Sequence, residues 1–383
     1  MCQEERIVIM LTINNQLIQR SRKVLDSLLN ENLDKYIDMF FYEKPVELRK
    51  QDATMLLEAG IVRAHGVKYI ANVMLFPYKG KLITTDFLLS IYKRDPKGRY
   101  LRGLDDVWVM FPHETLLFID NLDPINGNLA LDIASGSGAI SLFLADRFEK
   151  VIASDINPKA VAYARFNAVL NNAETKITNI QSDIFSSLQN HKFDYVCWNG
   201  PTVALPEVES PTSTYPLYTY GGFDGAEFTR KFLTQVPEHL QHDFRIKWWD
   251  GSLGDKESSV VEKFIRVNLK NMPIKVTIQY LNKTGGAPLI NYDRMYIKYN
   301  LDKFELNQNK HTEAIVKAWY DKLKTQNLTQ VYISLISIEK ADKFSIAHKY
   351  PEKSKVTPRH VFGFEWHAVS REYIRNYITS NRN

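Results

Sequence analysis

A short apolar segment followed by a glycine turn constrains this 383-residue chain more than any other stretch. Leu129 to Ala134 reads as a buried strand, and Ala139 to Ala145 reads as a helix. Glycines allow a close approach of the backbone to a ligand, and the N-terminus of a helix presents free N–H groups. A strand, a glycine turn and a helix in this order predict the opening of a doubly wound α/β sheet. The turn consists of Ser135, Gly136, Ser137 and Gly138.

The residues around the turn favour a ligand that carries a positive charge. A dinucleotide fingerprint has the pattern Gly-x-Gly-x-x-Gly after the strand, whereas Ser141 stands at the third glycine position here. Asp132 precedes the turn, where its carboxylate would repel a pyrophosphate. An acid at this point suits the amino group of a sulfonium amino acid. The turn therefore predicts S-adenosylmethionine as the ligand rather than NAD.

Acidic residues follow two later strands. Val151 to Ser154 reads as a second strand that ends at Asp155, whose carboxylate can accept hydrogen bonds from ribose hydroxyls. The pair Asn157-Pro158 is typical of a helix start. Ile177 to Gln181 reads as a third strand, and Asp183 after it can accept a hydrogen bond from an adenine amino group. A solvated surface acid remains the alternative for Asp155, and a turn-capping acid remains the alternative for Asp183.

A fourth strand, expected at Phe193 to Trp198, leads into the tetrapeptide Asn199-Gly-Pro-Thr202, which completes a family pattern. Residues 108–340 resemble a class I S-adenosylmethionine-dependent methyltransferase, in the group typified by the protein-glutamine N5-methyltransferases. That group also includes nucleic-acid and small-molecule amino methyltransferases. The resemblance implies a Rossmann-like α/β fold with a seven-stranded methyltransferase sheet and S-adenosyl-L-methionine as cofactor. Six segments carry it, in family order: Pro112-His-Glu-Thr115, Asp132 to Gly138, Ser154 to Ala160 with Asn167, Ser182 to Phe185, Asn199-Gly-Pro-Thr202 and Gly221 to Gly225.

The resemblance also implies roles for individual residues. Asn199 is the expected catalytic residue, because its side-chain carbonyl and the carbonyl of Gly200 would accept hydrogen bonds from an amino nitrogen. The residues expected to bind the substrate are Gly200, Pro201 and Tyr218. The residues expected to bind the cofactor are Thr115, Asp132, Ala134, Ser135, Gly136, Gly138, Asp155, Ile156, Asp183, Ile184 and Asn199.

The tetrapeptide departs from the family pattern, which is Asn-Pro-Pro followed by Tyr, Phe or Trp. Gly200 gives up the rigidity of proline, and Thr202 cannot stack on a flat acceptor group. An aromatic residue from nearby could replace the missing ring, and the candidates are Trp198, Tyr215, Tyr218 and Tyr220. A general base is not identifiable, and His113, Glu114 and Tyr218 stay open as alternatives.

Three parts are expected along the chain. Residues 1–105 read as a smaller α+β domain of winged-helix-like type, with helices and then strands at Tyr69 to Leu75 and Lys81 to Thr85. We expect this domain to cover the substrate or to support a homodimer, with DNA binding as an alternative. Residues 106–340 form the methyltransferase domain, which includes a strand at Val331 to Ile338, and residues 341–383 form a basic extension.

Composition excludes other classes of protein. An apolar fraction of 44% and a charged fraction of 24% are typical of a soluble globular protein, and a net charge of +5 is too small to demand nucleic acid. Two cysteines suggest no disulfide framework. The apolar run Ile7 to Ile13 is too short to span a membrane, and His239 and His242 have no cysteine or third histidine nearby. We expect a cytoplasmic protein without a metal.

The expected activity is transfer of a methyl group to a nitrogen or hydroxyl of a small molecule, such as a specialised metabolite in biosynthesis. Thr202 in place of an aromatic residue and the extra N-terminal domain favour this class of acceptor. One alternative is a methyltransferase that acts on a protein glutamine or on an adenine of a nucleic acid. An alternative of another class is a regulatory module that binds S-adenosylmethionine without catalysis.

Overall fold

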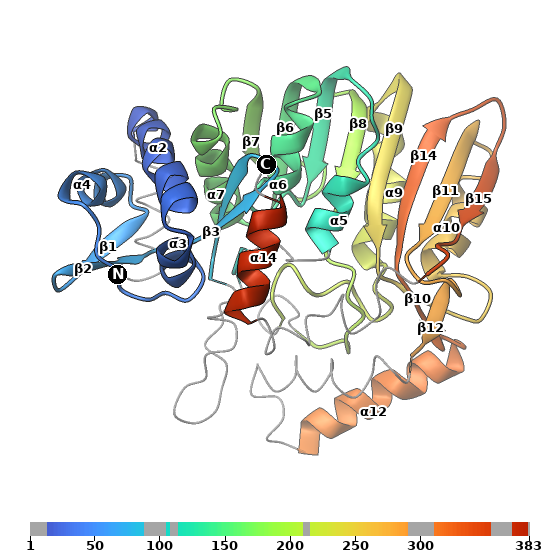
Figure 1. Cartoon of the computed structure of the whole chain (residues 1–383). Helices are drawn as coiled ribbons and strands as arrows, with labels where there is room; N and C mark the ends of the chain where they lie inside the picture. Colours follow the sequence, from blue (N-terminus) through green and yellow to red (C-terminus); the bar gives the residue numbers. More distant parts are fainter. Residues whose placement is uncertain are drawn as a thin grey trace.

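The computed structural model describes residues 14–87, 105–107, 114–209, 215–289, 310–353 and 370–381. Within these ranges the dominant element is a sheet of eight strands (Figure 1). In spatial order they are β15 (Ser345–Lys349), β11 (Ile274–Tyr280), β14 (Ser334–Lys340), β9 (Leu240–Asp250), β8 (Phe193–Trp198), β5 (Gly127–Ile133), β6 (Phe148–Asp155) and β7 (Ile177–Gln181).

The five strands from β9 to β7 are parallel, and β14 is antiparallel to both of its neighbours. This arrangement confirms the Rossmann-like α/β class. The sheet has one strand more than the seven expected, because β15, at the start of the predicted basic extension, pairs in parallel with the edge strand β11. Pairing satisfies backbone groups that an edge strand would otherwise leave open.

Helices cover both faces of the sheet, because alternate residues of each strand point to opposite faces. Leu131 and Val196 face a hydrophobic cluster that includes α9 (Glu227–Gln235) and α10 (Val260–Asn268). Their neighbours Ala130 and Tyr195 face a second cluster, which includes α6 (Ala139–Leu144) and α7 (Pro158–Leu170). None of the helices in the described parts of the chain is long and apolar enough to cross a membrane.

The described part of the N-terminal segment, residues 14–87, contains three helices and two hairpins. The expected strand at Tyr69 to Leu75 is divided, because Asn72 leaves the ladder and its side chain donates a hydrogen bond to the Gly60 carbonyl at 2.9 Å. The elements are α2 (Asn15–Glu31), α3 (Leu33–Phe40), α4 (Lys50–Glu58), β1 (Val62–His65), β2 (Lys68–Ala71), β3 (Met74–Tyr78) and β4 (Lys81–Thr85). The C-terminal helix α14 (Arg371–Asn381) returns to α3, where Arg371 forms an ion pair of 2.7 Å with Asp38.

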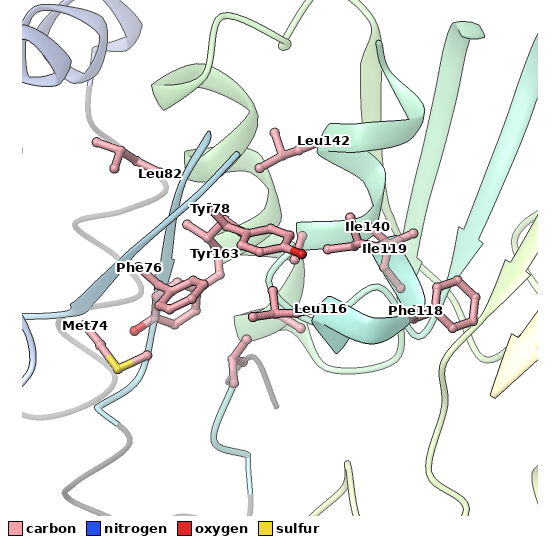
Figure 2. Close-up of a cluster of buried hydrophobic side chains, with 14 of the residues drawn as sticks. Met74, Phe76, Tyr78, Leu82, Leu116, Phe118, Ile119, Ile140, Leu142 and Tyr163 are labelled. Carbon is pink, nitrogen blue, oxygen red and sulfur yellow. The ribbon is translucent and has the colours of Figure 1, made fainter. Parts of the chain in front are cut away.

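The second hairpin, β3 and β4, shares its core with the helices that precede and follow the glycine turn. Figure 2 shows Tyr78 lying between the hairpin and the side chains of Ile140 and Leu142 in α6, with Leu116 of α5 (Glu114–Asp120) beside it. The hydroxyl of Tyr78 donates a hydrogen bond to Asp120 at the end of α5. The N-terminal segment is thus packed against the helices that frame the turn.

A polar contact joins the same hairpin to the glycine turn. The buried Asn167 of α7 accepts hydrogen bonds from the Thr84 backbone N–H and hydroxyl, both at 2.7 Å. Its amide donates to the Thr84 carbonyl at 3.0 Å and to the Ser137 carbonyl at 2.8 Å. One side chain therefore fixes the turn relative to strand β4.

Replacing Asn167 with Leu should lower the free energy of unfolding by about 2 to 4 kcal/mol, because it leaves buried polar groups of Thr84 and Ser137 without partners. Urea denaturation followed by circular dichroism measures this. Asn268→Ala is the matched control, since that exposed side chain makes one hydrogen bond within α10. Equal stabilities for the two variants would contradict a structural role for Asn167.

An insertion separates β11 from β14. It contains β12 (Gly286–Pro288), α12 (Lys310–Thr325) and β13 (Gln330–Tyr332). The strand predicted at Val331 to Ile338 is divided at Ile333, because its first part pairs with β12 and with β10 (Leu253–Gly254) in a separate three-stranded sheet. Figure 1 shows α12 beyond the ends of the large sheet.

Candidate active site

Parallel pairing brings the predicted polar residues to one edge of the sheet. In register, Asp132 of β5 lies beside Ala153 of β6 and Cys197 of β8. Asp155 and Asn199 each follow these partner residues by two positions, so they lie at the same carboxyl edge as the turn. Open α/β sheets bind ligands at this edge.

Asp132 is fully buried, and one of its carboxylate oxygens is held by a neighbouring hydroxyl. Ser141 donates to Oδ2 at 2.6 Å, whereas Oδ1 has no hydrogen-bond partner among the described residues. Burial raises the pKa of Asp132 to about 7, the Ser141 hydrogen bond opposes this, and the charge of Asp155 adds to it. A buried carboxylate oxygen of this kind favours a cationic donor. Ser141 was noted in the sequence only as a missing glycine, although a hydroxyl in the first helical turn was the signal for this contact.

The glycine turn is held open by Asp155. The Gly136 N–H donates to Asp155 Oδ2 at 2.8 Å, and the Asn157 N–H donates to Oδ1 at 2.9 Å. Burial raises the pKa of Asp155, and these backbone hydrogen bonds oppose the shift. A Cβ built on Gly136, whose φ is +54°, would meet nothing within 4 Å. As far as the described residues go, the space beside Gly136 is therefore open to a ligand.

Gly138 allows the turn to pack closely against helix α7. Its φ is +74°, and a Cβ there would lie 2.9 Å from the Cβ of Ala164 in α7. The glycine lets α6 begin against α7, and the predicted cap of α7 is confirmed by a 2.9 Å hydrogen bond from the Lys159 N–H to Asn157 Oδ1. The predicted Ala134, at φ +53°, and Ser135, whose N–H donates to the Ser154 carbonyl at 3.0 Å, shape the start of the turn.

The side chains after β6 and β7 form the outer part of this edge. Ile156 is 51% exposed directly after Asp155, which is a large value for an isoleucine in a folded core region. Asp183 is exposed, and its backbone N–H donates to Ser186 Oγ at 3.1 Å. Ile184 is buried and has a φ of +50°. The structure places these residues around the same edge, and their contact with a cofactor stays a prediction.

Asn199 has one side-chain oxygen ready to accept hydrogen bonds. Its Oδ1 is buried and has no partner within the described parts of the chain. Its side chain forms a hydrogen bond with Glu114, which lies at the start of α5. Burial raises the pKa of Glu114 to about 8, and the hydrogen bond with Asn199 opposes the shift. Glu114 is thus mostly protonated at neutral pH, and its carbonyl oxygen can still accept a hydrogen bond from the Asn199 amide.

Other predicted residues lie near Asn199 or outside the described ranges. Thr115, the next residue of α5, is 9% exposed. Pro112 and His113 fall outside the described residues, as does the N-terminal apolar run. The base alternatives that remain in view are therefore Glu114 and the half-buried Tyr218.

Trp198 explains why a glycine follows Asn199. A Cβ on Gly200 would lie 2.4 Å from Cζ2 of the Trp198 ring. That ring is 2% exposed and stacks on Phe232 of α9, with 5.2 Å between ring centroids. The Trp198 ring therefore occupies the space that a proline ring would need at position 200.

Thr202 points into the protein and does not form a platform for an acceptor. It is 6% exposed, and a Cβ on Gly251 would lie 2.7 Å from Thr202 Oγ1. Of the four aromatic replacements considered, Trp198 is buried, and Tyr215 and Tyr220 are buried and stacked on each other at 5.4 Å. Tyr218 keeps partial exposure and lies in the loop after the tetrapeptide.

The site fits S-adenosylmethionine on structural grounds. The open oxygen of Asp132 matches an amino group, and the space beside Gly136 lets a ligand approach the turn. Asp155 stands at the end of β6, where ribose hydroxyls are bound in related sheets.

Comparison with known proteins agrees with this site. A family model described as the methyltransferase small domain matches residues 111–211. A putative protein N5-glutamine methyltransferase of Methanocaldococcus jannaschii is 33% identical over 147 residues, which cover 38% of this chain and 73% of that protein. The release factor glutamine methyltransferase of Rhodopirellula baltica is 32% identical over 155 residues, which cover 37% of this chain and 52% of that protein.

A third relative, the ribosomal protein uL3 glutamine methyltransferase of Francisella tularensis, is 25% identical over 156 residues, or 39% of this chain and 46% of that protein. This chain thus spans about half the length of the second and third relatives. The first relative is matched over 73% of its length at 33% identity, which establishes that this chain belongs to the same family. The chain belongs to the class I S-adenosylmethionine-dependent methyltransferases, in the group of the protein N5-glutamine methyltransferases.

Proposed function

We propose that this enzyme transfers a methyl group to the side-chain amide nitrogen of a glutamine in an acceptor protein. The observation that carries the proposal is the buried Oδ1 of Asn199, which lacks a partner in the described residues and lies at the sheet edge that holds Asp132. This oxygen can accept a hydrogen bond from an amide N–H of the acceptor. The backbone carbonyl of Gly200, the next residue, offers a second hydrogen-bond acceptor.

The residues of the chain divide the work between binding and orientation. S-adenosylmethionine, the cofactor of this enzyme, supplies an activated methyl group when bound. Asn199 and the Gly200 carbonyl hold the acceptor nitrogen by its N–H groups, which leaves the lone pair free to point at the cofactor site. Positioning of this kind supplies a large part of the acceleration in a displacement reaction. Glu114 keeps the Asn199 amide from rotating, through the hydrogen bond between their side chains.

The cofactor residues have separate tasks in this proposal. Asp132 would receive the amino group, Asp155 the ribose hydroxyls and Asp183 the adenine amino group. Gly136 and Gly138 would shape the turn that borders the cofactor, with Ala134 and Ser135 at its start. Backbone or apolar contacts would come from Thr115, Ile156 and Ile184.

Names of relatives favour a protein over a small molecule as the acceptor. The three relatives compared above are named for glutamine methylation, two of them on a release factor or on ribosomal protein uL3. The small-molecule acceptor that the sequence favoured has no counterpart among them. Thr202 was one of two reasons for that prediction, beside the extra N-terminal domain, and its burial argues against a role of its side chain in selecting a small molecule.

A methyl-transfer assay tests the proposed function. Purified bacterial release factor and ribosomal protein uL3 are each incubated with the enzyme and methyl-labelled S-adenosylmethionine, and the products are digested and analysed by mass spectrometry. We expect N5-methylglutamine in at least one of the two proteins, and labelling about 100- to 1000-fold slower with the Asn199→Ala variant. Label on neither protein, with label on a small molecule from a cell extract, would overturn the proposal.

Cofactor binding should weaken below neutral pH. The amino group of the cofactor pairs with ionised Asp132, whose pKa is about 7, so a proton must leave before binding at lower pH. The Kd should therefore rise about tenfold between pH 7.5 and pH 6. Calorimetric titration at a series of pH values measures this, and the demethylated product should follow the same curve because it keeps the amino group. Asp132→Asn should bind weakly at every pH with a flat profile; a steep profile in that variant would assign the proton to another group.

A further inference from the structure

Helix α12 is a part of the chain that the family match does not account for. It belongs to the insertion between β11 and β14, whereas the family model ends at residue 211. Figure 1 shows it set apart from the large sheet, on the side of the loop that follows β8. One face of the helix is buried: Trp319 is 3% exposed and Leu323 is 1% exposed.

The loop that follows Asn199 folds back on itself. Its outgoing and returning limbs are joined by hydrogen bonds from the Val203 N–H to the Thr219 carbonyl at 3.2 Å and from the Leu205 N–H to the Gly222 carbonyl at 3.1 Å. A third bond runs from the Gly221 N–H to the Val203 carbonyl at 2.8 Å. The two limbs therefore move together.

The returning limb is packed directly on the tetrapeptide. A Cβ on Gly221 would lie 2.7 Å from the Thr202 carbonyl carbon, and a Cβ on Gly225 would lie 2.5 Å from the Thr202 carbonyl oxygen. These distances show that the backbone of the returning limb is closely packed against Thr202. A displacement of the loop would therefore reach the residues next to Asn199.

Helix α12 contacts both limbs of this loop. Trp319 Nε1 donates to the carbonyl of Phe223 in the returning limb at 2.8 Å. Lys322 Nζ lies 2.7 Å from Oε2 of Glu207 in the outgoing limb and 3.9 Å from the centre of the Phe223 ring. The segment of α12 from Trp319 to Lys322 thus contacts both limbs of the loop.

We infer that α12 sets the position of the loop that follows Asn199, and that Trp319 and Lys322 are positioning residues for acceptor binding. This inference rests on the proposed function, because it assumes that the acceptor enters beside Asn199. The part-buried hydrogen bond from Trp319 holds the returning limb. The cation–π contact of Lys322 with Phe223 and its more exposed ion pair with Glu207 connect the two limbs. Among the described residues, Trp319 and Lys322 contact the loop rather than Asp132 or Asp155, so we expect cofactor binding to be independent of both.

The test combines a measurement on the loop with a measurement on the acceptor. The double variant Trp319→Leu, Lys322→Gln is compared with wild type by hydrogen exchange of peptides that cover the loop. Its acceptor KM is measured with whichever of release factor and uL3 the wild type labels. Trp319→Phe keeps the ring and loses the N–H bond. The matched control is Lys317→Gln on the same helix, because Lys317 is 75% exposed and pairs with Asp321 rather than with the loop.

In the double variant we expect exchange of loop amides to rise at least about tenfold and acceptor KM to rise about tenfold. The kcat and the Kd for S-adenosylmethionine should stay within about twofold of wild type. Loop exchange and acceptor KM of Trp319→Phe should lie between those of the wild type and the double variant, and both values for Lys317→Gln should match wild type.

Unchanged loop exchange in the double variant would overturn the inference. A joint loss of kcat and cofactor affinity would also overturn it, because that pattern indicates general unfolding. Should the wild type label neither protein, the proposed function fails for those acceptors, while the exchange measurement still decides whether α12 holds the loop.

Discussion

Replacing Asn199 with Ala is expected to lower kcat about 100- to 1000-fold and to leave the Kd for S-adenosylmethionine within about twofold of wild type. The variant removes a buried side-chain oxygen that has no partner among the described residues, together with the side-chain amide that is hydrogen-bonded to Glu114. Acceptor N–H groups would then be held by the Gly200 carbonyl alone, and the nitrogen lone pair would no longer be aligned. Single-turnover transfer to the labelled acceptor protein, beside calorimetric titration of the cofactor, measures both quantities.

Two further variants separate a role in orientation from a role in folding. Asn128→Ala changes an exposed asparagine at the start of β5 and should leave both quantities unchanged. Glu114→Gln keeps an acceptor for the Asn199 amide and should retain most activity, whereas Glu114→Leu should approach the Asn199→Ala value. A fully active Asn199→Ala enzyme would remove Asn199 from the mechanism.

The sequence predicted the parts of the site that depend on neighbouring residues in the chain. Strands β7 and β8 have the boundaries expected from their apolar runs, and α7 starts at the expected Asn157-Pro158 pair. The glycine turn also follows from local pattern, because a positive φ at Gly138 is a local requirement. Once strands are parallel and adjacent, their polar ends must meet, so the grouping of Asp132 with Asp155 could be predicted as well.

What the sequence did not predict depends on contacts between distant segments. The edge strand β15 pairs with β11 about 70 residues earlier in the chain, and no local pattern specifies that partner. Thr202 appeared as a substitute for an aromatic residue that faces the acceptor, yet its packing against Gly251 places it inside the protein. Likewise, the contact of Trp319 with Phe223 spans 96 positions, and no local pattern in the sequence specifies it.

The difference between this chain and the family tetrapeptide therefore has two separate causes. Position 202 is occupied by a small residue because glycines from later segments close around it. Position 200 is occupied by glycine because the side chain two residues earlier is a tryptophan. The two carbonyl groups that would hold the acceptor nitrogen, the side-chain carbonyl of Asn199 and the backbone carbonyl of Gly200, survive both changes.

Replacing Gly200 with Ala should lower the free energy of unfolding by about 2 to 3 kcal/mol, because the new Cβ collides with the buried Trp198 ring. In a Trp198→Leu background the same change should cost less than about 1 kcal/mol, since the smaller side chain vacates that space. The coupling between the two changes, about 1 to 2 kcal/mol, is measured by a double-mutant cycle in urea. Gly200→Pro, which restores the family pattern, should be worse than Gly200→Ala in the wild-type background.

A second glycine distinguishes this collision from ordinary backbone strain. Gly80 has a φ of +74°, and a Cβ there would meet nothing within 4 Å. Gly80→Ala should therefore cost about 1 kcal/mol whether or not Trp198 is present. Gly200 has no positive φ, so its cost is steric and must depend on Trp198. Equal costs for Gly200→Ala in both backgrounds would show that the ring does not select glycine, and the reason for the departure from proline would then lie in the acceptor itself.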